Sequence, residues 1–201
     1  MKISIYLAGN IQKSHEGSSK IFWSEEDIKE FARHCAPIEI TFMNPADRTD
    51  DLSDQLSVFG RDITQVSLSD AILVDARGRR GLGVGAEMMW AKVRSIPVVT
   101  LAPHGTHYRK EEVTLLGETV ENWNHPFVES LSDRMVDNLE EAAVAVKELL
   151  ASPDLVKGPE SIEKAMDHYQ STQLEKDAPM RTLVESEEFL MERLSALTSY
   201  A

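Results

Sequence analysis

Short apolar runs alternate with amphipathic stretches along the first 150 or so residues of the chain. The apolar runs are rich in β-branched residues and stop at glycine, asparagine, aspartate or proline, a pattern typical of strands. They predict strands at 3–8, 38–43, 71–74 and 96–102. The third run is apolar throughout, which is typical of a parallel strand buried on both faces.

The amphipathic stretches predict helices. Residues 24–35 open with Ser24, whose side chain can cap a helix, and continue with three acids suited to a first turn. Over 51–68 the apolar residues recur at steps of three and four, which places them on one helical face. Similar patterns predict helices at 84–94 and 133–150.

Strands that alternate with helices predict a doubly wound parallel sheet, in a flavodoxin-like or Rossmann-like three-layer α/β sandwich. The segment 103–124 is polar and irregular, and contains no predicted element. Toward the C-terminus the composition changes, and 159–201 predict one or two charged helices. The sequence therefore predicts an α/β domain at 1–152 and a charged helical C-terminal extension at 153–201.

Composition narrows the classes of function. The 201 residues are 42% hydrophobic, enough for a sizeable core, and carry a formal net charge of −13. Nucleic-acid-binding domains normally present a basic patch, so the charge argues against a nucleic-acid partner. No apolar run approaches the roughly 18 residues of a membrane span, and the N-terminal residues lack the features of a secretory signal. We therefore expect a cytoplasmic protein with no membrane partner, whose single cysteine, Cys35, is a small buried hydrophobe.

Candidate chemistry gathers where predicted strands end, because ligands of parallel sheets bind outside the carboxyl ends of the strands. The first strand ends at Gly9 and Asn10, and the third leads into a run with alternating glycines at Gly81, Gly83 and Gly85. Such glycines favour a tight turn and a close approach of a ligand to the backbone. These five residues are candidates for substrate binding.

Glu87 follows the glycines, in what the pattern predicts as the first turn of a helix. The free N–H groups of that turn would hold its carboxylate ionised, and an ionised carboxylate can attack an electrophilic sugar carbon. Acids are also common in first turns without any chemical role. A dinucleotide-binding turn is a weaker alternative, because the glycines follow the third strand and lack the G-x-G-x-x-G spacing.

Two further side chains are candidates for the same site. Asp62 is expected near the C-terminal end of the second predicted helix, where an acid opposes the helix dipole, so local stability does not explain it. A solvated surface position is the plain alternative. Tyr6 stands on an otherwise aliphatic strand, and it either fills the core or uses its hydroxyl to orient a carboxylate.

Together these motifs resemble the nucleoside 2-deoxyribosyltransferase family and its relatives, the 2-deoxynucleoside 5-phosphate N-hydrolases. The order and separation of the motifs agree with the family over roughly residues 1–150. The matching motifs are YLAG at 6–9, RD at 61–62, SDAILV at 69–74 and LGVGAE at 82–87, the last followed by WA at 90–91.

The resemblance implies cleavage of the N-glycosidic bond of a 2-deoxynucleoside or its 5-monophosphate, with no metal and no cofactor. Glu87 would be the nucleophile at C1 of the deoxyribose, and Tyr6 would position its carboxylate. Asp62 would contact the base or sugar and assist proton transfer to the leaving base. The covalent deoxyribosyl-enzyme would then pass the sugar to a second base or to water.

The resemblance also implies a homodimer or higher homo-oligomer, because in this family a neighbouring subunit usually completes the active site. Asn124 is the candidate for that contribution, since an amide both donates and accepts; His125 beside it is a second candidate or a packing residue. Gly81 departs from the family, in which an acid or a serine can stand at this position. Where the N-hydrolases carry a phosphate loop after the first strand, this chain has Lys13 and Ser14.

Two alternatives remain open. A ribonucleotide N-glycosidase of the cytokinin-activating type also pairs a glycine-rich turn with a glutamate on an α/β sheet, but the run at 80–84 does not supply its fuller P-G-G-x-G-T-x-x-E pattern. A non-catalytic nucleotide-binding sensor would keep the pocket without turnover. The presence of both Glu87 and Asp62 argues mildly against a sensor.

Overall fold

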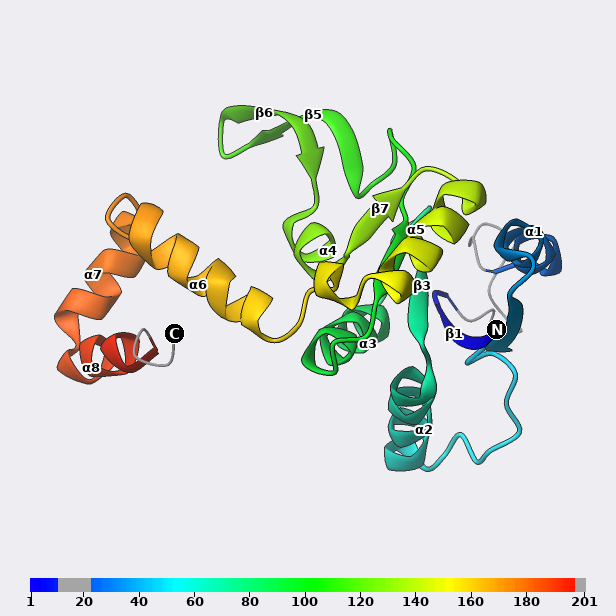
Figure 1. Cartoon of the computed structure of the whole chain (residues 1–201). Coiled ribbons are helices and arrows are strands. Elements are labelled where there is room, and N and C mark those ends of the chain that lie inside the picture. The colour runs from blue at the N-terminus through cyan, green and yellow to red at the C-terminus, as the bar shows by residue number, and fades with distance from the viewer. Residues whose placement is uncertain (11–22, 198–201) are drawn as a thin grey trace. The chain divides into compact units, whose positions relative to one another are not determined.

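A parallel five-stranded sheet forms the centre of the first of two compact units, Met1–Gly158. The structure is a computed structural model that describes residues 1–10 and 23–197. The strand order is β2-β1-β3-β4-β7 (Figure 1), so the chain runs outward from β1 in both directions and the switch point lies between β1 and β3. The predicted doubly wound α/β fold is therefore confirmed. The strands are β1 (Lys2–Ala8), β2 (Glu39–Met43), β3 (Ala71–Asp75), β4 (Val98–Leu101) and β7 (Arg134–Val136).

Helices cover both faces of this sheet (Figure 1). The first face packs against α1 (Glu25–Cys35) and α5 (Leu139–Ala151), and the second against α2 (Gln55–Leu68), α3 (Leu82–Val93) and α4 (Pro126–Leu131). The start of α1 is as predicted, because the Ser24 side chain accepts from the Asp27 N–H and Asp27 bonds back to Ser24.

Alternation along β1 assigns its side chains to two cores. Successive residues of a strand point to opposite faces, so Ile5 and Leu7 enter the core with α1 and α5, whereas Tyr6 and Ala8 enter the core with α2 and α3. Cys35 is fully buried in the first core, as predicted, and burial raises the pKa of its thiol to about 11. The Tyr6 side chain, with its hydroxyl, therefore lies in the second core, beneath α2 and α3.

Two predicted helices begin later than their apolar patterns indicated. Helix α2 starts at Gln55 rather than at residue 51, because the Asp54 side chain caps it. The prediction of one helix over 133–150 is wrong at its beginning: Arg134–Val136 forms the edge strand β7, and α5 starts only after Asn138, whose side chain accepts from the Glu141 N–H. An asparagine cap outweighs helical periodicity at this point.

The segment 103–124, predicted to be irregular, contains a β-hairpin. Its antiparallel strands are β5 (Arg109–Leu115) and β6 (Glu118–Asn124), joined at Leu116 and Gly117, which both have positive φ angles of 51° and 88°. Both strands are mostly exposed and carry charged residues on both faces. The apolar alternation that would have revealed them is therefore weak.

A buried ion pair ties α3 to the start of β7. The Lys92 ammonium lies 2.5 Å from the Asp133 carboxylate, and both side chains are fully buried. The same carboxylate accepts from the backbone N–H groups of Val98, at 2.6 Å, and Lys157, at 2.7 Å. A buried carboxylate with partners on all sides is stable where an unpaired one would not be.

The second compact unit, Pro159–Ala201, follows a short 3₁₀ helix at Pro153–Leu155. Its described part contains the helices α6 (Glu160–Thr172), α7 (Ala178–Ser186) and α8 (Glu188–Leu197), one more than the largest number predicted. The additional break falls at Glu187, the C-cap of α7. Among the described residues, no helix combines the length and apolarity needed to cross a membrane.

Candidate active site

A hydrogen bond between the first strand and the third helix forms the centre of the site. The side chain of Tyr6 is fully buried, and its O–H donates to Oε1 of Glu87 at 2.9 Å. The two residues are 81 positions apart in the chain, and the contact exists because α3 packs on the sheet face to which Tyr6 points. The sequence-based alternative in which the Tyr6 hydroxyl orients a carboxylate therefore describes the structure.

The glycines before Glu87 lie differently from the prediction. Gly81 is the N-cap of α3, which starts at Leu82, so Gly83 and Gly85 belong to the helix rather than to a tight turn. A Cβ atom added at any of these three glycines would meet no atom within 4 Å. They therefore leave the start of α3 bare and open to a ligand. Glu87 consequently lies in the second turn of the helix, not in the first.

Burial, rather than the helix dipole, dominates the charge state of Glu87. Desolvation raises its pKa to about 7, the hydrogen bond from Tyr6 lowers it, and the negative charge of Asp62 raises it. The prediction that the field at the helix N-terminus holds this carboxylate ionised is wrong, because that field fades beyond the first turn. Near neutral pH, Glu87 is poised between its two forms.

Tyr6 acts only as a donor in this pair. Burial first, and then the charge of Glu87 and its hydrogen bond, raise the pKa of the Tyr6 phenol far above its ordinary value. The hydroxyl therefore keeps its proton at any pH at which the protein operates. It remains able to hold Oε1 whether Glu87 is ionised or neutral.

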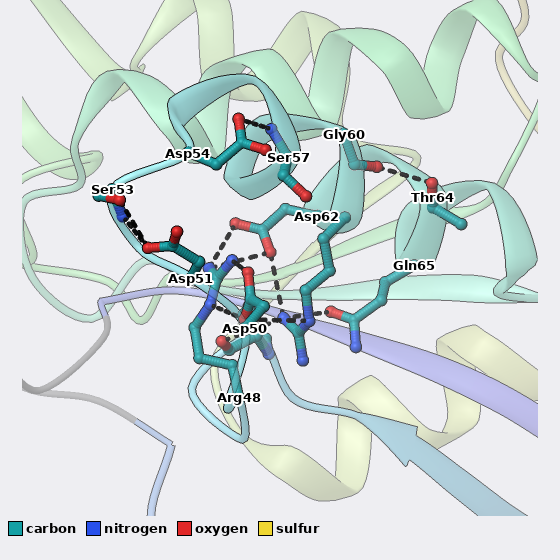
Figure 2. A network of polar contacts seen from close by, with 12 residues as sticks. Arg48, Asp50, Asp51, Ser53, Asp54, Ser57, Gly60, Asp62, Thr64 and Gln65 are labelled. Carbon is teal, nitrogen blue, oxygen red and sulfur yellow. Dashed lines mark hydrogen bonds and ion pairs between the residues drawn. The ribbon is translucent and has the colours of Figure 1, made fainter.

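Asp62 belongs to a network of arginines and acids next to this pair. It lies in the middle of α2, not near its C-terminal end, so the argument from an opposed dipole does not apply. Its carboxylate is 3.4 Å from Arg48 and 3.3 Å from Arg61, and Arg48 also binds Asp50 at 2.6 Å. Figure 2 shows the Asp62 carboxylate facing the Arg48 guanidinium. The charge of Asp62 raises the pKa of both Glu87 and Tyr6, so Asp62 lies near enough to act on the pair electrostatically.

The arginine partners of Asp62 were not among the predicted site residues. Arg48 precedes α2 in the chain, and its side chain is only 10% exposed. Arg61 also donates to the backbone carbonyl of Asp47 at 2.6 Å, which fixes the loop against the helix. A signal was present in the sequence, because a guanidinium on a loop rich in acids commonly forms such bidentate contacts.

A second polar cluster adjoins Gly9 and Asn10 at the carboxyl end of β1. A Cβ atom on Gly9 would lie 3.4 Å from Trp23 and 3.5 Å from Asp75, which is ordinary van der Waals contact, so Gly9 lies directly against both residues. Asp75 is fully buried at the end of β3, and both Arg77 and Arg80 form ion pairs with it. Gly9 therefore stands where the end of β1 meets a neutralised charge cluster.

The two candidate residues near the end of the hairpin, Asn124 and His125, have partners other than Glu87. The amide of Asn124 donates to Glu129 at 2.9 Å. His125 lies in an aromatic group with Tyr108 and Trp123, and it lines a cavity that Glu87 does not line. A contribution of either residue to a neighbouring subunit stays a prediction.

Two other expectations concern the phosphate loop and metal binding. Lys13 and Ser14 of the candidate phosphate loop lie outside the described residues. Within residues 1–10 and 23–197, no three side chains of histidine, cysteine, aspartate or glutamate are grouped so that they could hold a metal ion.

No protein-family model and no curated protein matches the chain. Among solved structures, the chain is similar to a 2-deoxyribosyltransferase from Bacillus psychrosaccharolyticus, with 14% identity, a TM-score of 0.43, and coverage of 70% of this chain and 90% of that one. It is also similar to a 2-deoxyribosyltransferase from Leishmania mexicana, with 15% identity, a TM-score of 0.45, and coverage of 75% and 98%.

Proposed function

We propose that the protein cleaves the N-glycosidic bond of 2-deoxynucleosides or their 5-monophosphates, with Glu87 as the covalent nucleophile. The observation that carries the proposal is the asymmetry of the Glu87 carboxylate. Oε1 accepts from Tyr6, whereas Oε2 is buried and has no hydrogen-bond partner among the described residues. Buried carboxylate oxygens are normally bonded, so the lone pairs of Oε2 are not committed to the fold, and a rotation of the side chain toward the sugar would make them available for attack.

The chemistry follows from this geometry in two displacements. Oε2 attacks C1 of the deoxyribose, the C1–N bond breaks, and its electron pair leaves with the base, which takes up a proton. The nitrogen of a second base, or the oxygen of water, then attacks C1 and loses a proton, while the C1–O bond breaks and the carboxylate is restored. The absence of a 2-hydroxyl favours this path, because an electron-withdrawing group beside C1 destabilises an oxocarbenium-like transition state.

The neighbouring residues supply positioning and charge. Tyr6 holds the carboxylate in one orientation, which reduces the entropy lost on reaching the transition state. Asp62 contacts the base or sugar and assists proton transfer to the leaving base, and its two arginine partners fix its orientation. Gly81, Gly83 and Gly85 let the sugar approach the start of α3. A base, a sugar and a nucleophile are thereby held together in one crevice.

The quaternary structure belongs to the same proposal. We infer that the active form is a homodimer or higher homo-oligomer in which Asn124, and with it His125, reaches a neighbouring copy of the site. Asn124 is the last residue of the hairpin and His125 follows it, and the strands of the hairpin are mostly exposed in the single chain. Sedimentation of the purified protein gives its assembly state, and a monomer at the concentration used in the activity assay would contradict this part of the proposal.

The decisive experiment is chromatography of reaction mixtures that contain each 2-deoxynucleoside or its monophosphate, with and without a free acceptor base. A new nucleoside formed only with the acceptor indicates transfer, and free base formed without it indicates hydrolysis. Glu87→Gln keeps the size and the hydrogen bond acceptor but removes the nucleophile, and we expect it to lower turnover at least 1,000-fold, or about 4 kcal/mol. Glu111→Gln, on an exposed strand of the hairpin, is the matched control. Undiminished turnover in Glu87→Gln would overturn the mechanism.

Tyr6→Phe tests the role of the hydrogen bond. Phenylalanine fills the same buried space, so the fold should persist. The hydrogen bond lowers the pKa of Glu87, and its loss should therefore move the ascending limb of the kcat/KM profile, expected near pH 7 in the parent, to higher pH. A profile with an unchanged midpoint would show that Tyr6 does not tune this carboxylate.

A further inference from the structure

The three helices of the second unit bury little of their own apolar surface. In its described part, residues 159–197, Val184 of α7 is the only buried residue. A unit of roughly 40 residues rarely forms a stable core by itself, and it usually relies on a disulfide, a metal or association with another chain. The single cysteine of the protein, Cys35, lies in the first unit, and no metal-binding group of side chains occurs among the described residues. Association with a partner is therefore the remaining way to stabilise these helices.

Each of the three helices exposes one methionine. Met166 of α6 is 40% exposed, Met180 of α7 is 36% exposed, and Met191 of α8 is 51% exposed. The unit also exposes other large apolar side chains to a similar extent, at Leu183, Phe189 and Leu197. Methionine is flexible and polarisable, and exposed methionines are therefore common on surfaces that adapt to the apolar face of a bound helix. The second unit presents a surface of this kind.

Acidic side chains accompany the exposed methionines. An acid stands three positions before each methionine, at Glu163, Asp177 and Glu188. Residues three positions apart are neighbours on the surface of a helix. Asp177 is the N-cap of α7, and its side chain accepts from the backbone N–H of Met180 at 3.2 Å. The surroundings of the methionines are therefore anionic.

The charge of the whole second unit has the same sign. Residues 159–201 contain nine acids and four bases. Two of these bases already have partners within the unit: Arg181 lies 3.8 Å from Glu175 and 3.9 Å from Glu185, and Arg193 lies over the ring of a nearby phenylalanine. Like charges oppose the packing of this surface on a second copy of itself, whereas a cationic partner is attracted to it.

We propose that the second unit binds a basic amphipathic helix of a partner protein. The apolar face of that helix packs against the exposed methionines, and its lysines and arginines pair with the acids beside them. Such a helix supplies the apolar surface that the unit lacks and neutralises its charge. The interaction does not depend on the reaction proposed at Glu87.

Fluorescence anisotropy of a labelled peptide, titrated with the full chain, tests the proposal. The probe is a leucine–lysine peptide of about 18 residues, whose leucines recur at steps of three and four and form one helical face. One control peptide has glutamate in place of each lysine, and a second has the composition of the probe in an order that gives no apolar face. We expect the probe to bind about tenfold or more tightly than either control, and its affinity to fall as salt is added. Undetectable binding of the probe, or equal binding of the probe and either control, would overturn the proposal.

Methionine variants locate the binding on the second unit. Met166→Gln combined with Met191→Gln should weaken the probe about tenfold, because glutamine keeps the length of the side chain but is polar. Met89→Gln is the matched control, since Met89 is 39% exposed and belongs to α3 of the first unit, and it should leave affinity unchanged. Affinity that is insensitive to the double variant would contradict the proposed surface.

Acid variants separate a local attraction from the charge of the whole chain. Glu163→Gln combined with Glu188→Gln should weaken the probe and reduce the salt dependence of its binding. Glu111→Gln combined with Glu112→Gln removes the same two charges from the exposed hairpin, and should have little effect. Equal losses in the two double variants would mean that net charge alone attracts the peptide. If the probe does not bind, and sedimentation shows self-association that Met166→Gln with Met191→Gln abolishes, the surface is a contact between copies and the proposal is wrong.

Discussion

At the scale of single residues, the environment of the proposed nucleophile, Glu87, disfavours its ionised form. The Glu87 carboxyl is surrounded by protein, receives one hydrogen bond, and lies close to the negative charge of Asp62. An ionised carboxylate is less stable there than in water, because burial penalises the charged form. The same desolvation makes the anion a stronger nucleophile. Reactivity at this position is therefore obtained at the expense of folding stability.

The raised pKa of Glu87 predicts how the stability of the protein depends on pH. In the unfolded chain Glu87 loses its proton near the ordinary value of 4.5, and in the folded protein near pH 7. Between these values the folded state binds more protons, so the free energy of unfolding falls as the pH rises, by about 3 kcal/mol for this group. Glu87→Gln has no such proton to lose. Denaturant unfolding at pH 5 and pH 8 should show a decrease in the parent that exceeds the decrease in Glu87→Gln by about that amount.

The comparison with Glu87→Gln serves as the internal reference, because all other titrating groups are shared. Tyr6→Phe gives the complementary result. It removes the hydrogen bond that lowers the Glu87 pKa, so the decrease between pH 5 and pH 8 should become steeper and extend to higher pH. Identical pH dependence in the parent and in Glu87→Gln would mean that the carboxylate is not desolvated as the structure indicates.

At the scale of elements, the hairpin β5–β6 is the part of the first unit with the least support. Its strands pair only with each other, and a two-stranded hairpin alone is marginally stable in water. The turn adds strain, since Leu116 has a φ of 51° and is fully exposed. A leucine in this left-handed region loses roughly 1 kcal/mol relative to residues that tolerate it.

Leu116→Asn should therefore stabilise the hairpin by about 0.5–1 kcal/mol. Asparagine followed by Gly117 is a preferred pair for a turn with two positive φ angles, and no packing is lost with an exposed side chain. Hydrogen exchange of the paired amides of Val113 and Val120 measures this local stability directly. Leu115→Asn, in the strand itself, should give no such protection. Exchange in Leu116→Asn that is as fast as in the parent would contradict the assignment of strain to this turn.

The elements also show which patterns in the sequence were sufficient to predict secondary structure. The strands with continuous apolar residues and the capped helix α1 could be predicted, because burial and capping both leave local signals. The hairpin could not, since its stability rests on a turn and on cross-strand pairs rather than on an apolar face. The beginning of the predicted helix 133–150 was wrong, because β4 recruits Arg134–Val136 as a parallel edge strand. Pairing with a strand more than 30 positions away outweighed a local preference.

Some features of the candidate site could likewise be predicted from the sequence, and others could not. That Tyr6 could orient a carboxylate was foreseeable from its position on an aliphatic strand, and the structure places its hydroxyl on Glu87. The charge state of Glu87 was not foreseeable, because desolvation depends on what covers the residue in three dimensions. The two arginines that hold Asp62 come from different segments, which only the folded loop before α2 brings together.

At the scale of the whole molecule, the chain divides into two compact units between Gly158 and Pro159. The segment just before this division completes the first unit. The Lys157 ammonium donates to the carbonyls of Ser132, at 2.7 Å, and Glu129, at 2.9 Å, and its backbone N–H donates to the buried Asp133 carboxylate. These contacts add a charged donor to carbonyls around the C-terminal end of α4, where the Glu129 carbonyl also accepts from the Ser132 N–H. Composition changes earlier, near residue 152, and gave no sign of this role.

Two truncated chains test where the first unit ends. A chain that stops at Gly158 keeps Lys157 and should unfold with a free energy within about 1 kcal/mol of the same unit in the full chain. A chain that stops at Ser152 leaves Asp133 short of a donor and should be less stable by about 3 kcal/mol or more, because hydrogen bonds to charged groups contribute roughly 1.5–3 kcal/mol each. Tryptophan fluorescence measures this, since the three tryptophans, Trp23, Trp90 and Trp123, all belong to the first unit. Lys157→Met in the full chain removes only the ammonium contacts and should lie between the two. Equal stability of both truncated chains would place the end of the unit at Ser152 and would make the Lys157 contacts dispensable.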